Sequence, residues 1–177
     1  MMKIVKRLLF GIGLLIVAIV ATSFALPSQF KVSRSMTINA PPEKIYPLIA
    51  MTAQWKNWTV WNQRDPNMKI DYAGPASGVG AKWSWVSQSE GSGEMEFTAA
   101  DPNKRLDYRL VFKDFNTTST GTLQLEPDGT GTKVTWSFAG EAGSNPMMRY
   151  MGLMMDGMIG KDFAAGLANL KVVAERI

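Results

Sequence analysis

The sequence predicts an α+β fold of the helix-grip kind, in which an antiparallel sheet of about seven strands wraps on one long C-terminal helix. Apolar and polar residues alternate in seven short segments between Phe30 and Phe138, and a period of two is typical of half-buried strands. The segment from Asn145 to Ile177 is long and amphipathic, so we expect it to cover the apolar face of the sheet. A length of 177 residues suits one domain with a short appendage.

An uncharged apolar segment, residues 8–26, precedes this domain and predicts one transmembrane helix. Its 19 residues nearly match the ~20 that a helix needs to cross the hydrocarbon core of a bilayer. Basic residues lie before it, so the positive-inside rule makes residues 1–7 a cytoplasmic basic stub. The helix-grip domain of residues 30–177 is then expected on the extracytoplasmic (periplasmic) side of the membrane.

A cleaved signal peptide is the alternative interpretation of this segment. Ser23-Phe24-Ala25 has the small-x-small form of a cleavage site. Against cleavage, the apolar run is longer than the ~7–15 residues of a signal-peptide core, and Pro27 would follow closely after the cut. Both interpretations export the domain, and the mature N-terminus distinguishes between them.

The domain is expected to begin with a strand and two short helical segments. Phe30 to Asn39 alternates as a half-buried strand. Pro41-Pro42-Glu43 then favours a helix start, and Pro47 keeps that helix short because it cannot donate to the helical hydrogen-bond ladder. Three tryptophans follow at a spacing of three, near one face of a helical or 3₁₀ turn: Trp55, Trp58 and Trp61.

Six further alternating segments predict the remaining strands. Turn residues separate them at short spacing, which predicts an antiparallel meander. Polar residues at the intervening positions give the sheet one wet face and one apolar face. The apolar positions of the six strands are Met68, Ile70 and Tyr72; Trp83 and Trp85; Met95 and Phe97; Leu106, Tyr108, Leu110 and Phe112; Leu123 and Leu125; and Val134, Trp136 and Phe138.

The C-terminal segment is expected to be helical, with Pro146 in its first turn. Gly157 and Gly160 weaken its middle and Asp162 has the chemistry of a helix cap, so we expect a break or kink near Gly160. Methionine is flexible and polarizable, so the methionine-rich half is interpreted as a movable lid, a loosely specified core helix or a membrane-facing patch. Its methionines are Met147, Met148, Met151, Met154, Met155 and Met158.

The composition excludes several classes of function. The chain has no cysteine and no histidine, which excludes disulfides, thiolate nucleophiles, Cys/His zinc sites and histidine acid–base relays. No cofactor and no metal site is predicted. The formal charge of +4 arises mainly before the apolar segment, and acids and bases nearly cancel from Phe30 onward. Nucleic acid is therefore not an expected partner, because the folded part has no basic stripe.

Five motifs of the domain mark a fold and include no catalytic signature. They are Asn39-Ala40-Pro41-Pro42-Glu43, the Trp55/Trp58/Trp61 cluster, Ser77-Gly78-Val79-Gly80-Ala81, Pro102-Asn103-Lys104-Arg105 and Gly131-Thr132-Lys133-Val134-Thr135-Trp136. Through these motifs the domain resembles the START-like polyketide cyclase/dehydrase (SRPBCC) superfamily over Phe30 to Ile177, and the N-terminal anchor resembles that of its bacterial members. The resemblance implies a cavity between sheet and helix that accepts apolar small molecules in many members, among them lipid carriers and cyclases.

The candidate cavity has aromatic walls, and no charged residue is in register with the inward strand positions, so we expect no ionised group at the enclosed space. An empty apolar void of ~300 Å³ would cost about 7 kcal/mol, so a cavity of that size must be occupied, partly wet or largely collapsed. A plain packed core is the alternative. The predicted cavity-lining residues are Tyr72, Trp83, Trp85, Met95, Phe97, Tyr108, Phe112, Trp136, Met151, Met155 and Met158.

The leading hypothesis is a membrane-tethered binding domain for an apolar small molecule such as a lipid, a quinone or a polyketide-like molecule. The alternatives are a cyclase/dehydratase-type enzyme on the same fold and a partner-binding domain without a ligand. An enzyme needs a general acid or base in the pocket; Asp156 is the first candidate, and a solvated helix residue is its alternative interpretation. The acid–base candidates are Tyr72, Tyr108, Arg109 (on the outer face by strand parity), Arg149, Asp156 and Asp162.

Overall fold

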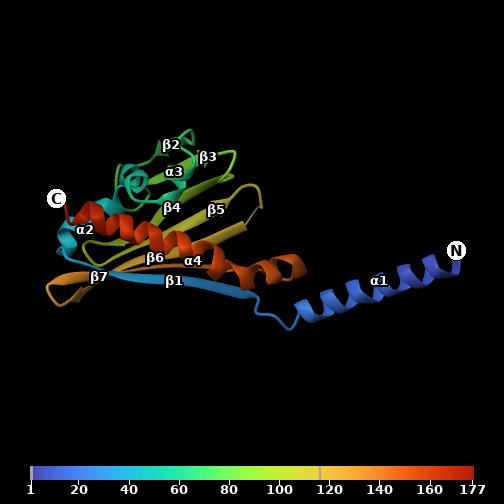
Figure 1. The fold of residues 1–177 in the computed structure, drawn as a ribbon. Coiled ribbons are helices and arrows are strands. Elements are labelled where there is room, and N and C mark those ends of the chain that lie inside the picture. The colour runs from blue at the N-terminus through green and yellow to red at the C-terminus, as the bar shows by residue number, and fades with distance from the viewer. Residues whose placement is uncertain (1, 116) are drawn as a thin grey trace.

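The computed structural model describes residues 2–115 and 117–177 and shows a seven-stranded antiparallel sheet with a long helix across one face (Figure 1). The predicted fold class and the order of strands and helices are confirmed. The strands are β1 Gln29–Ile38, β2 Lys69–Ala73, β3 Lys82–Val86, β4 Ser92–Asp101, β5 Arg105–Phe112, β6 Thr117–Asp128 and β7 Gly131–Glu141. The helices are α1 Met2–Ser23, α2 Pro42–Ala50, the 3₁₀ helix η1 Thr52–Asn57, α3 Val60–Arg64 and α4 Pro146–Ala174.

The strands from β2 to β7 form the predicted meander, and β1 closes the sheet beside β7 in the order β1-β7-β6-β5-β4-β3-β2. Cross-strand partners such as Val32 and Phe138, or Trp83 and Met95, put apolar side chains on the same face. Along β5 the buried residues alternate with more exposed ones, as a half-buried strand requires. Helix α4 packs on the long strands β1 and β7, and the short β2 forms the opposite edge of the sheet.

Two tryptophans from η1 and the turn after it fill the space over one half of the sheet. The Trp55 indole donates to the Ile49 carbonyl at 2.7 Å, and the Trp58 indole donates to the Leu48 carbonyl at 3.0 Å. Both acceptors lie at the end of α2, so the indoles satisfy carbonyls that a helix end leaves without intrahelical partners. Burying an indole with its N–H paired avoids the cost of an unsatisfied donor.

Helix α4 is continuous from Pro146 to Ala174, so a break near Gly160 is ruled out, while a kink there stays a prediction. The Asn145 side chain caps it by accepting from the Met147 and Met148 amides. Gly160 lies where the Arg34 side chain of β1 crosses the helix, and a Cβ there would collide with the guanidinium group. The glycine thus serves close packing between helix and sheet.

The C-terminal half of α4 forms the core with β7. Phe163 stacks on Trp136 with the ring centroids 3.9 Å apart. Leu167 and Leu170 are fully buried one and two turns further on. Aromatic pairs of this kind contribute about 0.5–1.5 kcal/mol beyond their buried area, so this half of the helix is firmly attached to the sheet.

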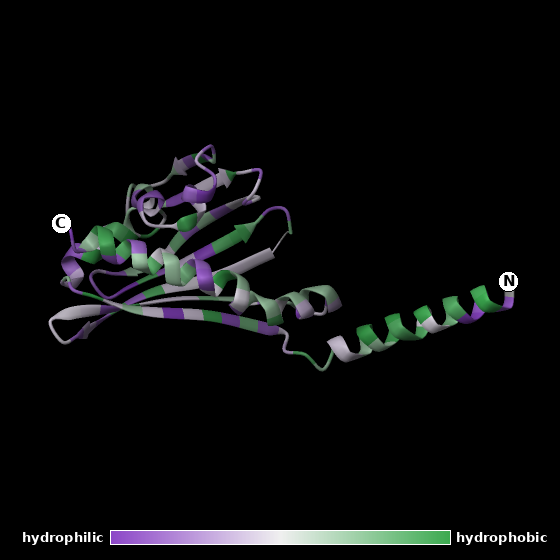
Figure 2. Ribbon diagram, viewed as in Figure 1, coloured by the Kyte–Doolittle hydropathy of each residue, from purple (hydrophilic) through white to green (hydrophobic). Residues whose placement is uncertain are grey.

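Helix α1 extends away from the domain, starting from the end of the sheet where β1 begins (Figure 1). The span Lys3–Ser23 is long and apolar enough to cross a membrane by length and composition. Figure 2 shows it as hydrophobic along most of its length, with hydrophilic residues near its N-terminal end. The apolar side chains of its residues 4–20 are exposed, for example Phe10 at 70%.

Candidate functional site

A cavity of about 390 Å³ lies between the sheet, α3 and α4. Strands β2 to β5 form its floor, η1 and α3 its roof, and the middle of α4 one side. The volume falls within the ~300–1,000 Å³ of small-molecule sites and equals that of about 13 liquid water molecules. The lining residues are Trp55, Thr59, Trp61, Asn62, Arg64, Met68, Ile70, Trp83, Trp85, Glu90, Met95, Leu110, Phe112, Met158, Ile159 and Asp162.

The floor is apolar because strand parity turns large side chains inward while a glycine leaves them room. Trp85 pairs with Gly93 on the neighbouring strand, and a Cβ at position 93 would collide with its indole. The indole therefore lies along the sheet. Its ring is edge-on to Phe112, with the centroids 6.2 Å apart. The result is a continuous aromatic surface under the cavity.

Five of the eleven residues predicted to line a cavity belong to its wall: Trp83, Trp85, Met95, Phe112 and Met158. Phe97, Tyr108 and Trp136 are fully buried in the core instead. The reason is Trp55, whose ring centroid lies 5.9, 5.8 and 5.7 Å from those of Phe97, Tyr108 and Trp136. One half of the sheet–helix space is thus solid, and the cavity occupies the other half.

The three remaining predicted residues also lie outside the cavity wall. Tyr72 is 46% exposed on the edge strand β2, beyond the cover of α3. Met155 is partly buried against the core, and Met151 is half-buried further toward the start of α4. The helix therefore offers the predicted Met158 and also Ile159 to the cavity, whereas Met155 and Met151 lie about one and two turns earlier along α4.

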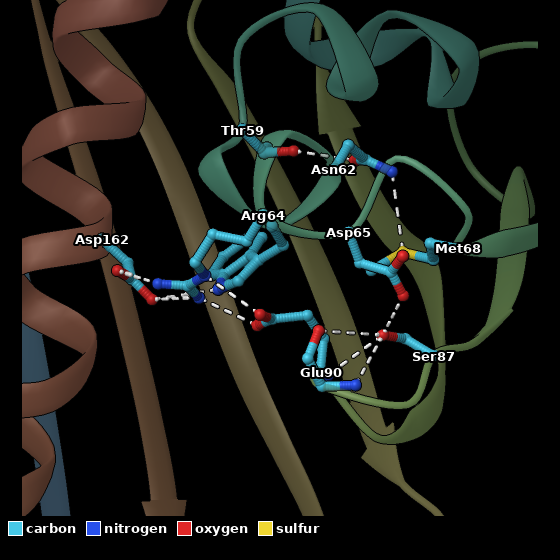
Figure 3. Close-up of polar contacts among 10 residues, drawn as sticks. Thr59, Asn62, Arg64, Asp65, Met68, Ser87, Glu90 and Asp162 are labelled. Atoms are coloured by element: carbon cyan, nitrogen blue, oxygen red, sulfur yellow. Dashed lines mark hydrogen bonds and ion pairs between the residues drawn. The ribbon is translucent and has the colours of Figure 1, made fainter.

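A cluster of three charged residues forms one wall of the cavity (Figure 3). Arg64 donates to both oxygens of Asp162, at 2.8 and 2.9 Å, and to both oxygens of Glu90, at 3.0 and 2.9 Å. The Trp61 indole also donates to Asp162, at 3.1 Å. Bidentate contacts between arginine and carboxylates are among the strongest protein hydrogen bonds. They raise the pKa of Arg64 above its ordinary value, mainly through Asp162 and then Glu90.

The expectation that no ionised group borders the enclosed space is therefore wrong. It followed from strand parity, but the three charged residues come from α3, from the loop between β3 and β4, and from α4. The sequence holds a partial signal for Arg64, since it lies three residues after Trp61 and so shares a helical face with it. Glu90 lies in an irregular loop and has no such signal.

The loop that carries Glu90 is held in place by hydrogen bonds around Ser87. The Ser87 hydroxyl donates to Asp65 at 2.5 Å and accepts from the Glu90 amide at 3.0 Å. Asp65 directly follows α3, so the loop is joined to this end of the helix twice, through Asp65 and through Arg64. The cluster thus joins α3, the β3–β4 loop and α4 beside the cavity.

The other acid–base candidates do not face the cavity. The Asp156 side chain is 61% exposed and pairs with Arg34 at 2.8 Å, which holds the pKa of Asp156 below its ordinary value. Arg109 pairs with Glu96 on the outer face of the sheet, as strand parity predicts. Tyr108 is buried in the core, where its hydroxyl accepts from the Trp136 indole at 2.8 Å and burial raises its pKa. Asp162 is the one candidate in the cavity wall.

The sheet, the helix that it grips and the cavity between them define the class of protein to which the chain belongs. The profile of the family described as polyketide cyclase / dehydrase and lipid transport matches residues 29–175, and the chain belongs to this family. The predicted resemblance of the domain is thereby confirmed. No match was found among curated proteins.

Solved structures of similar proteins have the same fold at low sequence identity. Protein MLL2253 from Mesorhizobium loti is 23% identical, with a TM-score of 0.59 over 82% of this chain and 97% of that chain. A protein from Rhizobium leguminosarum is 15% identical, with a TM-score of 0.61 over 84% and 96%. Protein Ms6760 from Mycobacterium smegmatis is 16% identical, with a TM-score of 0.59 over 83% and 92%. These likenesses support the fold alone.

Proposed function

We propose that this chain is a membrane-tethered binding domain for an apolar small molecule held between the sheet and α4. The observation that carries the proposal is the 390 Å³ cavity, in which eleven of the sixteen lining residues are apolar. The description of the family includes lipid transport, which supports a ligand of this kind. A lipid, a quinone or a polyketide-like molecule fits these walls by chemistry.

The free-energy cost of an empty cavity of this size favours occupancy by water or a ligand. At ~24 cal/mol per Å³, an empty cavity of 390 Å³ would cost about 9 kcal/mol. This is comparable to the ~5–15 kcal/mol that stabilises a whole domain. Arg64 and Met158 are partly exposed at its edge, so water or a ligand can enter. Displacing water from indole and phenyl walls favours an apolar ligand.

The cyclase/dehydratase alternative is less well supported by the geometry. A general acid or base must gain or lose a proton during the reaction. All four carboxylate oxygens of Glu90 and Asp162 already accept hydrogen bonds from Arg64, and one also accepts from Trp61. Breaking these contacts to transfer a proton would disrupt the cavity wall, so a binding function agrees better with the arrangement.

The proposed tether places the cavity near the membrane. Residues 8–26 would span the bilayer, with residues 1–7 in the cytoplasm and the domain of residues 30–177 outside. In the cavity wall, Trp85 lies near the end of β3 and Phe112 at the end of β5. Through the pairing of β4 to β7, both strand ends lie at the end of the sheet where β1 begins. Helix α1 extends from this same end (Figure 1). The cavity would then occupy the membrane-proximal half of the domain, where an apolar ligand is most concentrated.

Extraction and mass spectrometry of the full chain, purified gently in lipid nanodiscs, tests the proposal. We expect an apolar molecule in excess over empty nanodiscs. Ile70→Trp, which fills the cavity from its floor, should reduce the recovered molecule about tenfold or more, because the added ring takes up space that the ligand needs and a tenfold loss corresponds to only ~1.4 kcal/mol of affinity. Asp71→Trp is the matched control, because the next side chain on β2 points to the other face. Equal recovery from both variants, or none from the native chain, contradicts the proposal.

A further inference from the structure

The charged wall of the cavity has more hydrogen-bond acceptors than donors left for a ligand. A guanidinium group has five N–H donors. Arg64 uses four of them on the two carboxylates: one from Nε, one from Nη1 and two from Nη2. Its capacity to hold an additional anion is nearly exhausted.

The two carboxylates keep spare capacity. Glu90 and Asp162 together offer about eight lone-pair sites, and four contacts from Arg64 plus one from Trp61 occupy five of them. The side chains of Glu90 and Asp162 are 16% and 20% exposed, whereas that of Arg64 is 46% exposed. The carboxylates are thus the more sheltered members, and the cation lies more toward solvent.

The net charge of the cluster also favours a ligand that donates hydrogen bonds over an anionic ligand. One guanidinium and two carboxylates sum to one negative charge, beside apolar walls that weaken screening by water. Among the described residues that line the cavity, Arg64 is the one basic side chain. An acid entering the cavity would meet this negative charge without a free cation to offset it, whereas a hydroxyl or amine would find acceptors.

We infer that the cavity selects apolar molecules whose polar end donates hydrogen bonds, such as alcohols, phenols or amines, and discriminates against carboxylate- or phosphate-ended molecules. This inference rests on the proposed function of the cavity. The apolar part of the ligand lies on the Trp85–Phe112 surface, and its polar end lies at Glu90 and Asp162. The specificity-determining residues are therefore Arg64, Glu90 and Asp162.

Bromine quenching of tryptophan fluorescence can measure this selectivity on the full chain. The chain has six tryptophans, and none lies in α1. A brominated probe that merely enters the bilayer beside α1 is therefore distinguished from one that enters the cavity, where four indoles line the wall. The probes are 12-bromododecan-1-ol and 12-bromododecanoate, added to the chain in phosphatidylcholine nanodiscs at a pH where the acid is ionised.

The native chain should bind the alcohol about tenfold more tightly than the acid, because a hydrogen bond that a hydroxyl donates to a carboxylate is stronger than one between neutral groups, and the acid is repelled. Glu90→Gln makes the cluster neutral and should reduce the difference in affinity between the alcohol and the acid. Glu96→Gln is the matched control: it removes a carboxylate that pairs with Arg109 outside the cavity, and the difference should remain.

Two outcomes overturn the inference in different ways. If the native chain binds the acid as tightly as the alcohol, the selectivity is wrong while the binding function stands. If neither probe quenches the tryptophan fluorescence more than its unbrominated counterpart does, the cavity does not take amphiphiles, and the proposed function falls with the inference.

Discussion

At the scale of single residues, Arg64 contributes most to the structure of the cavity wall, because it joins three segments of the chain there. It contacts Glu90 of the β3–β4 loop and Asp162 of α4 while belonging to α3. Without it, two sheltered carboxylates would lie close together with no cation. Charge pairs of this kind matter most when the partners lose contact with water.

Arg64→Met should destabilise the domain by about 1–2 kcal/mol, a value reduced by the partial exposure of the guanidinium group. Thermal unfolding followed by the near-ultraviolet circular dichroism of the tryptophans measures this. Arg109→Met is the control, since it breaks a pair exposed on both sides and should change stability by about 0.5 kcal/mol or less. Equal effects of the two substitutions would show that the Arg64 cluster is an ordinary surface contact.

Asp156 gives a prediction about pH. Its pKa is lowered from the ordinary 3.8 by the hydrogen bonds and charge of Arg34. A lowered pKa means that the ion pair stabilises the fold above pH 3.8 and that this stabilisation is lost as the pH falls through the lowered value. Asp156→Asn should therefore reduce the melting temperature at neutral pH, and the difference from the native chain should vanish well below pH 3.8. A difference that persists in acid would contradict an electrostatic origin.

What the sequence predicts at this scale depends on the type of structure that positions a residue. Strand parity correctly turns Trp83, Trp85 and Met95 inward, because neighbouring strand residues must alternate. It cannot distinguish a lining residue from a core residue such as Tyr108, because that depends on where the Trp55 indole is inserted. Arg64, Glu90 and Asp162 meet only in the tertiary structure, so no local pattern predicts their cluster.

At the scale of elements, α4 consists of two halves with different attachment to the sheet. The half after Gly160 holds Phe163, Leu167 and Leu170 in the core, whereas Met154 and Met158 before it are 61% and 58% exposed. The Arg34–Asp156 pair forms an ionic contact between this outer half and β1. The number and order of strands were predictable from alternation. The continuity of α4 was not, because Gly160 makes room for the Arg34 side chain of β1, and a contact between distant elements leaves no local pattern.

Two glycines of α4 test this view of the helix. A Cβ at Gly157 would meet no atom within 4 Å, so Gly157→Ala should stabilise the domain by about 0.5–1 kcal/mol through helix propensity. Gly160→Ala should not, because the new methyl group displaces Arg34 from Asp156. Thermal melts of the two variants give the comparison. A similar gain at both positions would mean that the close approach of Arg34 contributes nothing.

At the scale of the whole molecule, α1 and the domain are in contact as well as linked. The Tyr150 hydroxyl of α4 donates to the Ile19 carbonyl at 3.0 Å and lies 2.7 Å from the Thr22 hydroxyl oxygen. Arg149 donates to the carbonyls of Phe24 and Leu26 just beyond the helix, at 3.1 and 3.2 Å. Tyrosine and arginine suit a membrane surface, where one part of the side chain is apolar and the other is wet. The contacts support a domain held close to the bilayer by the start of α4.

The absence of cysteine from the sequence allows the proposed topology to be tested with single thiols. Ser28→Cys places a thiol just after the apolar segment, and Lys3→Cys places one before it. An impermeant maleimide applied to intact spheroplasts should label the first and spare the second, and both should remain in the membrane fraction. The reverse labelling would invert the orientation, and release of the Ser28→Cys chain as a soluble protein would indicate a cleaved signal peptide.

In the proposed function, the space between β2–β5, α3 and α4 holds an apolar molecule. An experimental density map of the full chain, purified from its native membrane without exchange of bound lipids, tests this. We expect continuous density of an apolar molecule along Trp85 and Phe112, with its polar end within hydrogen-bond distance of Glu90 or Asp162. A cavity that contains only water, or that has collapsed because Trp61 and Met158 fill it, would contradict the proposed function.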